Sequence, residues 1–168
     1  MIKRSLLVLT ATLLLPSMSF AAACVDGANP DGCDITTNNT EHTLTGNIST
    51  TGDYGDGLHI DSADNNTTTL TGNISTTGFL ASSLHIDCSD NNTTSFTGNI
   101  SNTGLGGAGL VLNNSDSNTT SLTGDISTTG VNGYGMYLTS SDSNTTTFTG
   151  DISTTGVNGY GMYLTSSD

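Results

Sequence analysis

Apolar and polar residues alternate in short stretches of the chain, and turn-forming residues separate these stretches. Leu44, Gly46 and Ile48 are separated by single polar residues, and Leu58 and Ile60 flank a histidine. A period of two is typical of a β-strand that buries one face. No stretch shows the period of a helix, and the abundant Asn, Thr, Gly and Ser are poor helix formers. The pattern therefore predicts an all-β protein.

The alternating stretches return at a fixed interval. The phrase LTGNISTTG begins at Leu44 and again at Leu70, and variants begin at Phe96, Leu122 and Phe148, so every interval is 26 residues. Residues 43–168 divide into five units, of which the last is incomplete: 43–68, 69–94, 95–120, 121–146 and 147–168. Four apolar columns run through these units: Leu44, Leu70, Phe96, Leu122 and Phe148; Ile48, Ile74, Ile100, Ile126 and Ile152; Leu58, Leu84, Leu110, Met136 and Met162; and Ile60, Ile86, Leu112, Leu138 and Leu164.

One unit is too small to bury its own apolar side chains, so neighbouring units must stack and share a core. We therefore expect a right-handed parallel β-helix with 26-residue coils, each built from two or three short strands. Gly46 and Gly52 recur in every unit, which indicates a tight corner or an unusual backbone angle. The segment 52–57 varies most between units and is expected to be a surface loop.

One coil is written twice. The letters TGDISTTGVNGYGMYLTSSD occupy residues 123–142 and return at residues 149–168. Because each unit of a solenoid contacts only its neighbours, an added coil is tolerated. The copy indicates a recent duplication of one coil.

Two polar columns are expected to form ladders in the turns. The amide column is Asn66, Asn92, Asn118 and Asn144, and the acidic column beside it is Asp64, Asp90, Asp116 and Asp142. Stacked amides can hydrogen-bond from coil to coil. Asp commonly caps turns, and this interpretation is favoured over calcium binding because the calcium-binding nonapeptide of β-rolls is missing from the sequence. No cofactor is expected.

The first 23 residues have the pattern of a cleavable signal peptide. Lys3 and Arg4 precede an apolar run, and small residues end at Ala23. A lipoprotein signal ending before Cys24 is the less favoured alternative. Residues 24–42 would form an N-terminal cap segment, in which a disulfide between Cys24 and Cys33 is plausible in an exported protein.

The charge balance excludes one class of partner. The formal net charge is -13, from 15 acidic and 2 basic residues, and the two basic residues are Lys3 and Arg4. Cleavage near Ala23 would change the charge to -15, since -13 minus 2 is -15. A chain without cations cannot neutralise phosphates, so nucleic-acid binding is not expected.

Two sets of side chains are candidates for binding sites. His59 and Asp61, and the equivalent His85 and Asp87, should point outward and stack on one small patch, where a transition metal could bind. Three tyrosines are the best candidates for contact residues, because tyrosine is amphipathic and these are expected to be borne by the variable loops: Tyr54, Tyr134 and Tyr160.

Two other functions remain open as alternatives. Thr-x-Thr or Ser-x-Thr recurs at Thr43/Thr45, Thr69/Thr71, Ser95/Thr97, Ser121/Thr123 and Thr147/Thr149, which resembles the hydroxyl arrays of ice-binding proteins. Some β-helices are polysaccharide-acting enzymes, and paired carboxylates can hydrolyse glycosides. Enzymatic activity is not expected, because no carboxylate pair stands outside the repeats.

The signal peptide, the Gly/Asn/Thr/Ser-rich units such as TLTGNISTTG and the scarcity of cysteine and lysine in the coils resemble the passenger region of bacterial autotransporter adhesins. The resemblance covers residues 22–168. It implies display on, or release from, the outer membrane of a Gram-negative cell, and adhesion to a molecule on a host or neighbouring cell. It also implies an outer-membrane translocator, whose C-terminal barrel would lie in a missing part of the chain.

Overall fold

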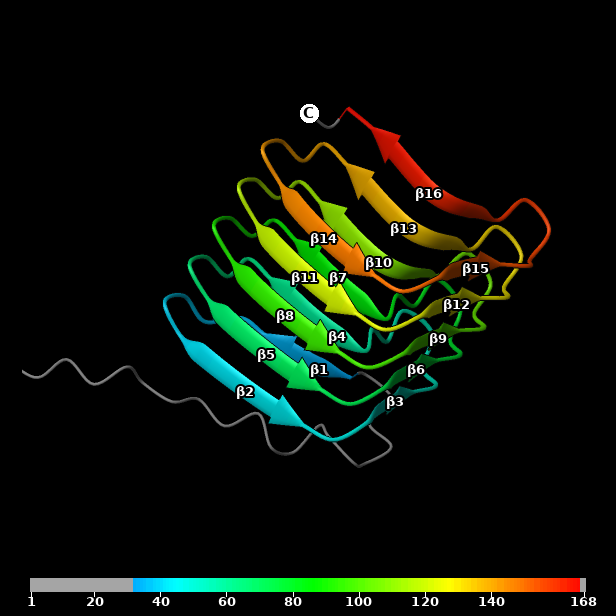
Figure 1. Ribbon diagram of the computed structural model, residues 1–168, viewed down its shortest axis with the longest axis horizontal. Coiled ribbons are helices and arrows are strands. Elements are labelled where there is room, and N and C mark those ends of the chain that lie inside the picture. The colour runs from blue at the N-terminus through cyan, green and yellow to red at the C-terminus, as the bar shows by residue number, and fades with distance from the viewer. Residues whose placement is uncertain (1–31, 167–168) are drawn as a thin grey trace, which may run out of the picture.

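The computed structural model describes residues 32–166 and confirms the all-β prediction. This part of the chain is a parallel β-solenoid of three sheets, without helices (Figure 1). The expected signal peptide (residues 1–23) and Cys24 lie outside the described residues. None of the described residues belongs to a helix that could cross a membrane.

Each sheet takes one strand from every coil, and all neighbouring strands pair in parallel. The six-stranded sheet contains β1 (Cys33–Ile35), β4 (Leu58–Asp61), β7 (Leu84–Asp87), β10 (Ala108–Asn113), β13 (Tyr134–Thr139) and β16 (Tyr160–Thr165). The second sheet, called the threonine sheet below, contains β2 (Glu41–Thr45), β5 (Thr67–Thr71), β8 (Thr93–Thr97), β11 (Thr119–Thr123) and β14 (Thr145–Thr149). The third contains β3 (Ile48–Thr50), β6 (Ile74–Thr76), β9 (Ile100–Asn102), β12 (Ile126–Thr128) and β15 (Ile152–Thr154).

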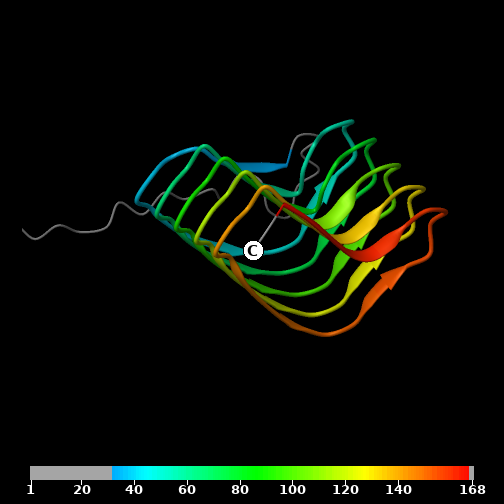
Figure 2. The same cartoon turned by 90° about the horizontal axis from the view of Figure 1, so that it is seen from above.

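The coils wind to the right. In Figure 1 the threonine sheet lies in front with its strands running to the lower right, and the six-stranded sheet lies behind with its strands running back to the upper left. The chain climbs from β2 towards β16 as it circles, and Figure 2 shows the same stack of coils from above. From β4 onward, equivalent residues pair at the 26-residue interval, as in Leu58 with Leu84.

Each coil has three strands because a corner interrupts the alternating stretch that begins at Leu44. Strand β2 ends at Thr45 and β3 begins at Ile48. Gly46 between them has a φ of 131°, in the region that favours glycine. A Cβ on the next glycine of this column, Gly72, would lie 1.9 Å from the carbonyl oxygen of Gly46. The corner therefore needs glycine both for its backbone angle and for the close stacking of coils.

The four apolar columns form the core, as predicted. Leu58, Ile60, Leu84 and Ile86 are 0% exposed. The same columns are less covered in the final coil, where Met162 is 55% exposed, because among the described residues only one coil packs against it. The shared core confirms that burial comes from stacking.

Both predicted ladders are present. The side-chain oxygen of Asn118 accepts a hydrogen bond of 2.8 Å from the backbone N–H of Asn92, one coil earlier. In the acidic column the direction is reversed, and Asp90 Oδ1 accepts a 2.8 Å bond from the N–H of Asp116, one coil later. The amide ladder therefore joins side chain to backbone, and the aspartates cap backbone N–H groups of the next coil rather than of their own turn.

The two described cysteines differ in state. Cys33 is disulfide-bonded and buried, whereas Cys88 is a free and exposed thiol. The pairing of Cys33 with Cys24 stays a prediction, because Cys24 lies outside the described residues.

Candidate binding face of the six-stranded sheet

The outer face of the six-stranded sheet carries two side-by-side columns whose chemistry changes along the solenoid. One column contains residues that pair with one another from strand to strand: His59, His85, Val111, Tyr137 and Tyr163. The other column contains the residues three positions earlier in each coil: Asp56, Ser82, Ala108, Tyr134 and Tyr160. The face is therefore imidazole and carboxylate at one end, small in the middle and aromatic at the other end.

The two histidines come together as predicted. The rings of His59 and His85 stack with centroids 4.8 Å apart and an angle of 17° between their planes. They lie on adjacent strands, β4 and β7, in direct register. Both rings are half-buried, because the neighbouring coils cover part of each.

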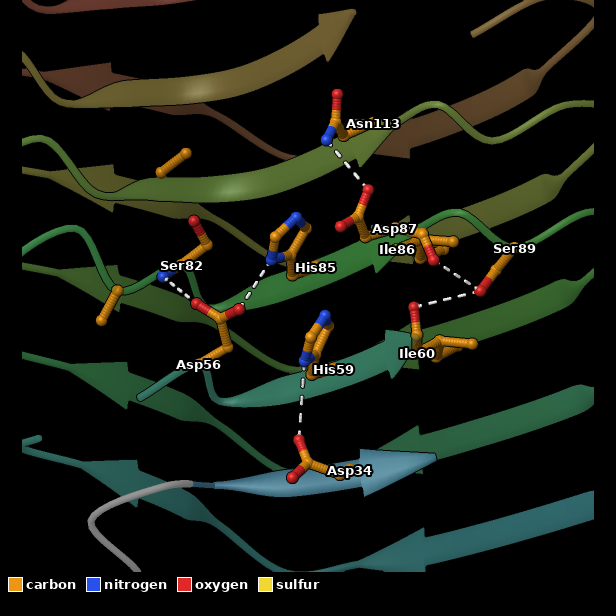
Figure 3. A network of polar contacts seen from close by, with 12 residues as sticks. Asp34, Asp56, His59, Ile60, Ser82, His85, Ile86, Asp87, Ser89 and Asn113 are labelled. Atoms are coloured by element: carbon orange, nitrogen blue, oxygen red, sulfur yellow. Dashed lines mark hydrogen bonds and ion pairs between the residues drawn. The ribbon is translucent and has the colours of Figure 1, made fainter. Parts of the chain in front are cut away.

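Asp56 completes this cluster, although the sequence did not single it out. Its Oδ2 lies 2.6 Å from His85 Nδ1, and its Oδ1 accepts a 2.5 Å bond from the backbone N–H of Ser82. One ligand atom from each of Asp56, His59 and His85 lies within 4.8 Å of the other two (Figure 3). Among residues 32–166, the later coils carry no acid at this position, so only its place two residues ahead of β4 signals its role.

The two aspartates that the sequence placed in this site lie apart from it. Asp61 accepts a 3.0 Å hydrogen bond from Ser62 Oγ. Asp87 accepts one of 2.9 Å from Asn113 Nδ2 (Figure 3). Neither belongs to the group of close ligand atoms. The structure thus corrects the predicted set of ligands. The carboxylate beside the two imidazole rings belongs to Asp56, two residues before β4, and not to Asp61 at the end of that strand.

Four tyrosines stack at the other end of the face. Tyr134 and Tyr160 are 5.8 Å apart with planes 12° from parallel, and Tyr137 and Tyr163 are 5.6 Å apart at 10°. The two stacks touch each other, since the rings of Tyr134 and Tyr137 lie 5.1 Å apart. The duplicated coil repeats the pair Tyr134 and Tyr137 as Tyr160 and Tyr163, so the four rings form one continuous array.

The three predicted contact tyrosines lie in two different parts of the coils, two in strands and one in a loop. Tyr134 and Tyr160 are the first residues of β13 and β16, so the expectation that they are borne by loops is wrong. Tyr54 does lie in the variable loop, 66% exposed, and its ring meets Phe79 edge-on at 5.6 Å. Tyr137 and Tyr163 were not singled out from the sequence, although they occupy the same column as His59 and His85.

A groove separates the two ends of the face. It has a volume of about 330 Å³, and small side chains in the middle coils leave it open. Its lining residues are Ser82, His85, Gly106, Ala108, Val111, Asn113, Tyr134, Tyr137 and Thr139. Aromatic rings thus form one wall, and a mixture of small, apolar and polar residues lines the rest.

The threonine sheet presents a second regular surface. Its strands alternate exposed and buried residues, so three files of outward side chains run along the solenoid. Two of the files are those predicted from the sequence. The structure adds a third, formed by Thr67, Thr93, Thr119 and Thr145. Glu41 occupies this position in the first coil.

Comparisons with known proteins do not assign the chain to a family. No protein-family model matches the sequence, and neither a curated protein nor a solved structure is significantly similar to it.

Proposed function

We propose that the protein is an exported β-solenoid that acts as an adhesive scaffold, and that it binds its target through the tyrosine end of the six-stranded sheet. The observation that carries this proposal is the stack of Tyr134, Tyr137, Tyr160 and Tyr163 beside an open groove. The signal-like N-terminus and the resemblance to autotransporter passengers support display outside a Gram-negative cell.

The chemistry of this face fits a neutral saccharide. Tyrosine rings offer flat apolar surfaces with a polar tip, against which the C–H faces of sugar rings pack. Asn113 and Thr139 line the same groove with groups that can hydrogen-bond to sugar hydroxyls. Anionic saccharides are disfavoured, since the chain carries a net charge of -13 and its only basic residues are Lys3 and Arg4. The target would be a neutral glycan on a host or neighbouring cell.

Adhesion of protein-coated beads to cells, with neutral oligosaccharides as soluble competitors, tests this function. Tyr137→Val is a suitable variant, because the solenoid already carries Val111 at this position. We expect it to reduce bead adhesion and saccharide binding by at least about tenfold, comparable to losing one central aromatic contact. Tyr54→Asn is the matched control, because Asn132 and Asn158 occupy the equivalent loop position with the same backbone angle.

Two results would contradict the proposal. Equal adhesion by Tyr137→Val and the unchanged protein would remove the tyrosine face as the binding surface. Loss of adhesion in Tyr54→Asn alone would move binding to the variable loops.

The threonine sheet favours ice binding as a second candidate function. Its three files of outward hydroxyl residues form a regular lattice, with spacings of roughly 4.8 Å between coils and roughly 6.7 Å along a strand. Regular hydroxyl and methyl groups of this kind can order water in an ice-like arrangement. Thermal hysteresis that is lost in Thr97→Tyr but kept in Tyr137→Val would establish this function, and the absence of hysteresis in the unchanged protein would remove it.

A further inference from the structure

We propose that Asp56, His59 and His85 form a binding site for one divalent transition-metal ion of the Zn²⁺ class. The site lies at the histidine end of the six-stranded sheet (Figure 3). The stacked tyrosines lie on the later strands β13 and β16. The proposal does not depend on the adhesive function.

The donor set matches the chemistry of Zn²⁺. Two imidazoles and one carboxylate are ligands that Zn²⁺, Ni²⁺ and Cu²⁺ accept, and three protein ligands with one open position are typical of accessible zinc sites. The three ligand atoms lie within 4.8 Å of one another. Tetrahedral coordination with Zn–N bonds of about 2.0–2.1 Å brings ligand atoms to about 3.3 Å from each other. Binding would lengthen the 2.6 Å separation of Asp56 Oδ2 and His85 Nδ1 and shorten the longest separation in the group. Rotation of the half-buried imidazoles would provide both changes.

An unpartnered nitrogen marks the site. His59 Nε2 is buried and has no hydrogen-bond partner. The other nitrogen of the ring, Nδ1, faces Asp34 Oδ1 at 3.6 Å. The negative charge of Asp34 on this side of the ring favours the tautomer with the proton on Nδ1, which leaves Nε2 free to bind a metal; a carboxylate behind a ligating histidine is the usual arrangement. Metal binding would give this buried nitrogen the partner that it lacks.

Asp56 and His85 are positioned in advance. The backbone N–H of Ser82 fixes one oxygen of Asp56, and the second oxygen lies at His85 Nδ1. An ion at this point takes the place of the proton on His85 Nδ1, and that proton moves to Nε2 of the neutral ring. Coordination therefore uses a side-chain arrangement that already exists.

The local charge also favours a cation. Asp34 and Asp56 both face the imidazoles, and no Lys or Arg lies among residues 32–166. A bound divalent ion would offset this negative charge. His85 also lines the groove, so the open coordination position would lie at the edge of the groove.

The sequence supplies this site once. In the next coil Val111 and Ala108 stand where His85 and Ser82 stand, and the following coils carry tyrosines at these positions. We therefore expect one ion per chain, bound between the first two coils.

Calorimetric titration of the untagged, chelator-treated full chain with ZnCl₂ tests the proposal. We expect one Zn²⁺ per chain, and we expect His59→Val and His85→Val each to weaken binding at least about 100-fold, more than the loss of a group behind a ligand. Valine is chosen because Val111 occupies the same column, so these variants keep the fold. Asp34→Asn should weaken binding about 10-fold, as expected for a positioning residue. The His59 and His85 ring signals in NMR spectra should shift on addition of Zn²⁺.

Asp61→Asn and Asp87→Asn are the matched controls, because they remove carboxylates from the same strands outside the cluster. Both should bind Zn²⁺ as tightly as the unchanged chain. Absence of one-to-one binding, or equal affinity in His59→Val and His85→Val, would overturn the proposal. Weakening by Asp87→Asn as large as by Asp56→Asn would overturn the assigned ligand set. Far-UV circular dichroism of every variant confirms that the coils are intact.

Discussion

The side-chain oxygen of Asn92 accepts a hydrogen bond of 2.8 Å from the backbone amide of Asn66 in the preceding coil. The Nδ2 group of Asn92 donates a second bond, of 2.9 Å, to the carbonyl of Ala63. Asn92 is 1% exposed, so its loss would leave two backbone groups without partners in the interior. We expect Asn92→Ala to lower the free energy of unfolding by about 2–4 kcal/mol. Urea denaturation followed by circular dichroism measures the change.

An exposed member of a similar ladder provides the control for this prediction. Asn73 Oδ1 accepts a 2.8 Å bond from the N–H of Asn99, but on the surface. Water can replace this bond, so Asn73→Ala should cost only about 0.5–1 kcal/mol. Equal losses for Asn73→Ala and Asn92→Ala would show that burial of the amide ladder does not contribute to stability.

The fold could be predicted because each structural column repeats one kind of residue in the sequence. Period-two alternation gave the core face, and the 26-residue interval gave the parallel register. The corner after β2 could not be placed from alternation alone, because Leu44 and Ile48 keep the same parity on both sides of it. Gly46 was the only local sign of that corner, and its φ of 131° confirms the role.

The candidate site was harder to predict because its neighbours do not follow strand alternation. Positions 56 and 59 have opposite parity and would face opposite sides of an ideal strand. The chain enters β4 only at Leu58, so Asp56 is free to lie beside the histidines. Tyr134 and Tyr137 have the same spacing and also lie on one side of the sheet. Such contacts depend on the local path of the backbone, which a repeat pattern does not specify.

Removing one charge from the acidic column should stabilise the solenoid. Asp116 Oδ1 accepts a 2.8 Å bond from the N–H of Asp142, and its nearest carboxylate neighbours are one coil away, roughly 4.8 Å. Asn38 makes the equivalent bond to Asp64 at 2.9 Å, so an amide can serve as this cap. Asp116→Asn should therefore raise the melting temperature, and the gain should shrink in 1 M salt because salt screens the repulsion.

Asp116→Ala separates capping from charge repulsion. It removes the same charge but also the hydrogen bond, so it should be about 1 kcal/mol less stable than Asp116→Asn. If the alanine and asparagine variants had equal stability in thermal unfolding, the carboxylate would not act as a cap.

The threonine sheet also carries a file of inward hydroxyls whose removal should be stabilising. Thr94 is 1% exposed, and its Oγ1 has no hydrogen-bond partner. Thr94→Val keeps the shape of the side chain and removes a buried polar group, so it should raise the free energy of unfolding by about 1 kcal/mol. Thr93→Val, on the outer side of the same strand, is the control and should change stability little. A loss of stability in Thr94→Val would mean that the buried hydroxyl has a partner in solution.

The variable loop contains a residue that is unfavourable for its backbone angle. Leu80 has a φ of 54°, whereas the equivalent Asn132 and Asn158 have 56° and 58°. Asparagine tolerates this left-handed conformation better than leucine, for which it costs roughly 1–2 kcal/mol. Leu80 is 44% exposed, so its replacement sacrifices little burial. Leu80→Asn should stabilise the protein in urea by about 0.5–1 kcal/mol, and Asn132→Leu should destabilise it.

The reactivity of the Cys88 thiol should depend on the negative charges of the neighbouring aspartates. The negative charge of Asp87 raises the pKa of the Cys88 thiol above its usual range, with smaller contributions from desolvation, Asp61 and Asp90. Because only the thiolate reacts, alkylation by iodoacetamide at pH 8 should be slower than for a cysteine in a short peptide, and its midpoint should lie at higher pH. Asp87→Asn removes the largest cause, so it should lower this pKa and speed alkylation at pH 8, whereas Asp90→Asn should have a smaller effect. Rates are followed by mass spectrometry without reductant, so that the disulfide of Cys33 stays closed. An unchanged alkylation midpoint in Asp87→Asn would show that the Asp87 carboxylate does not control the thiol.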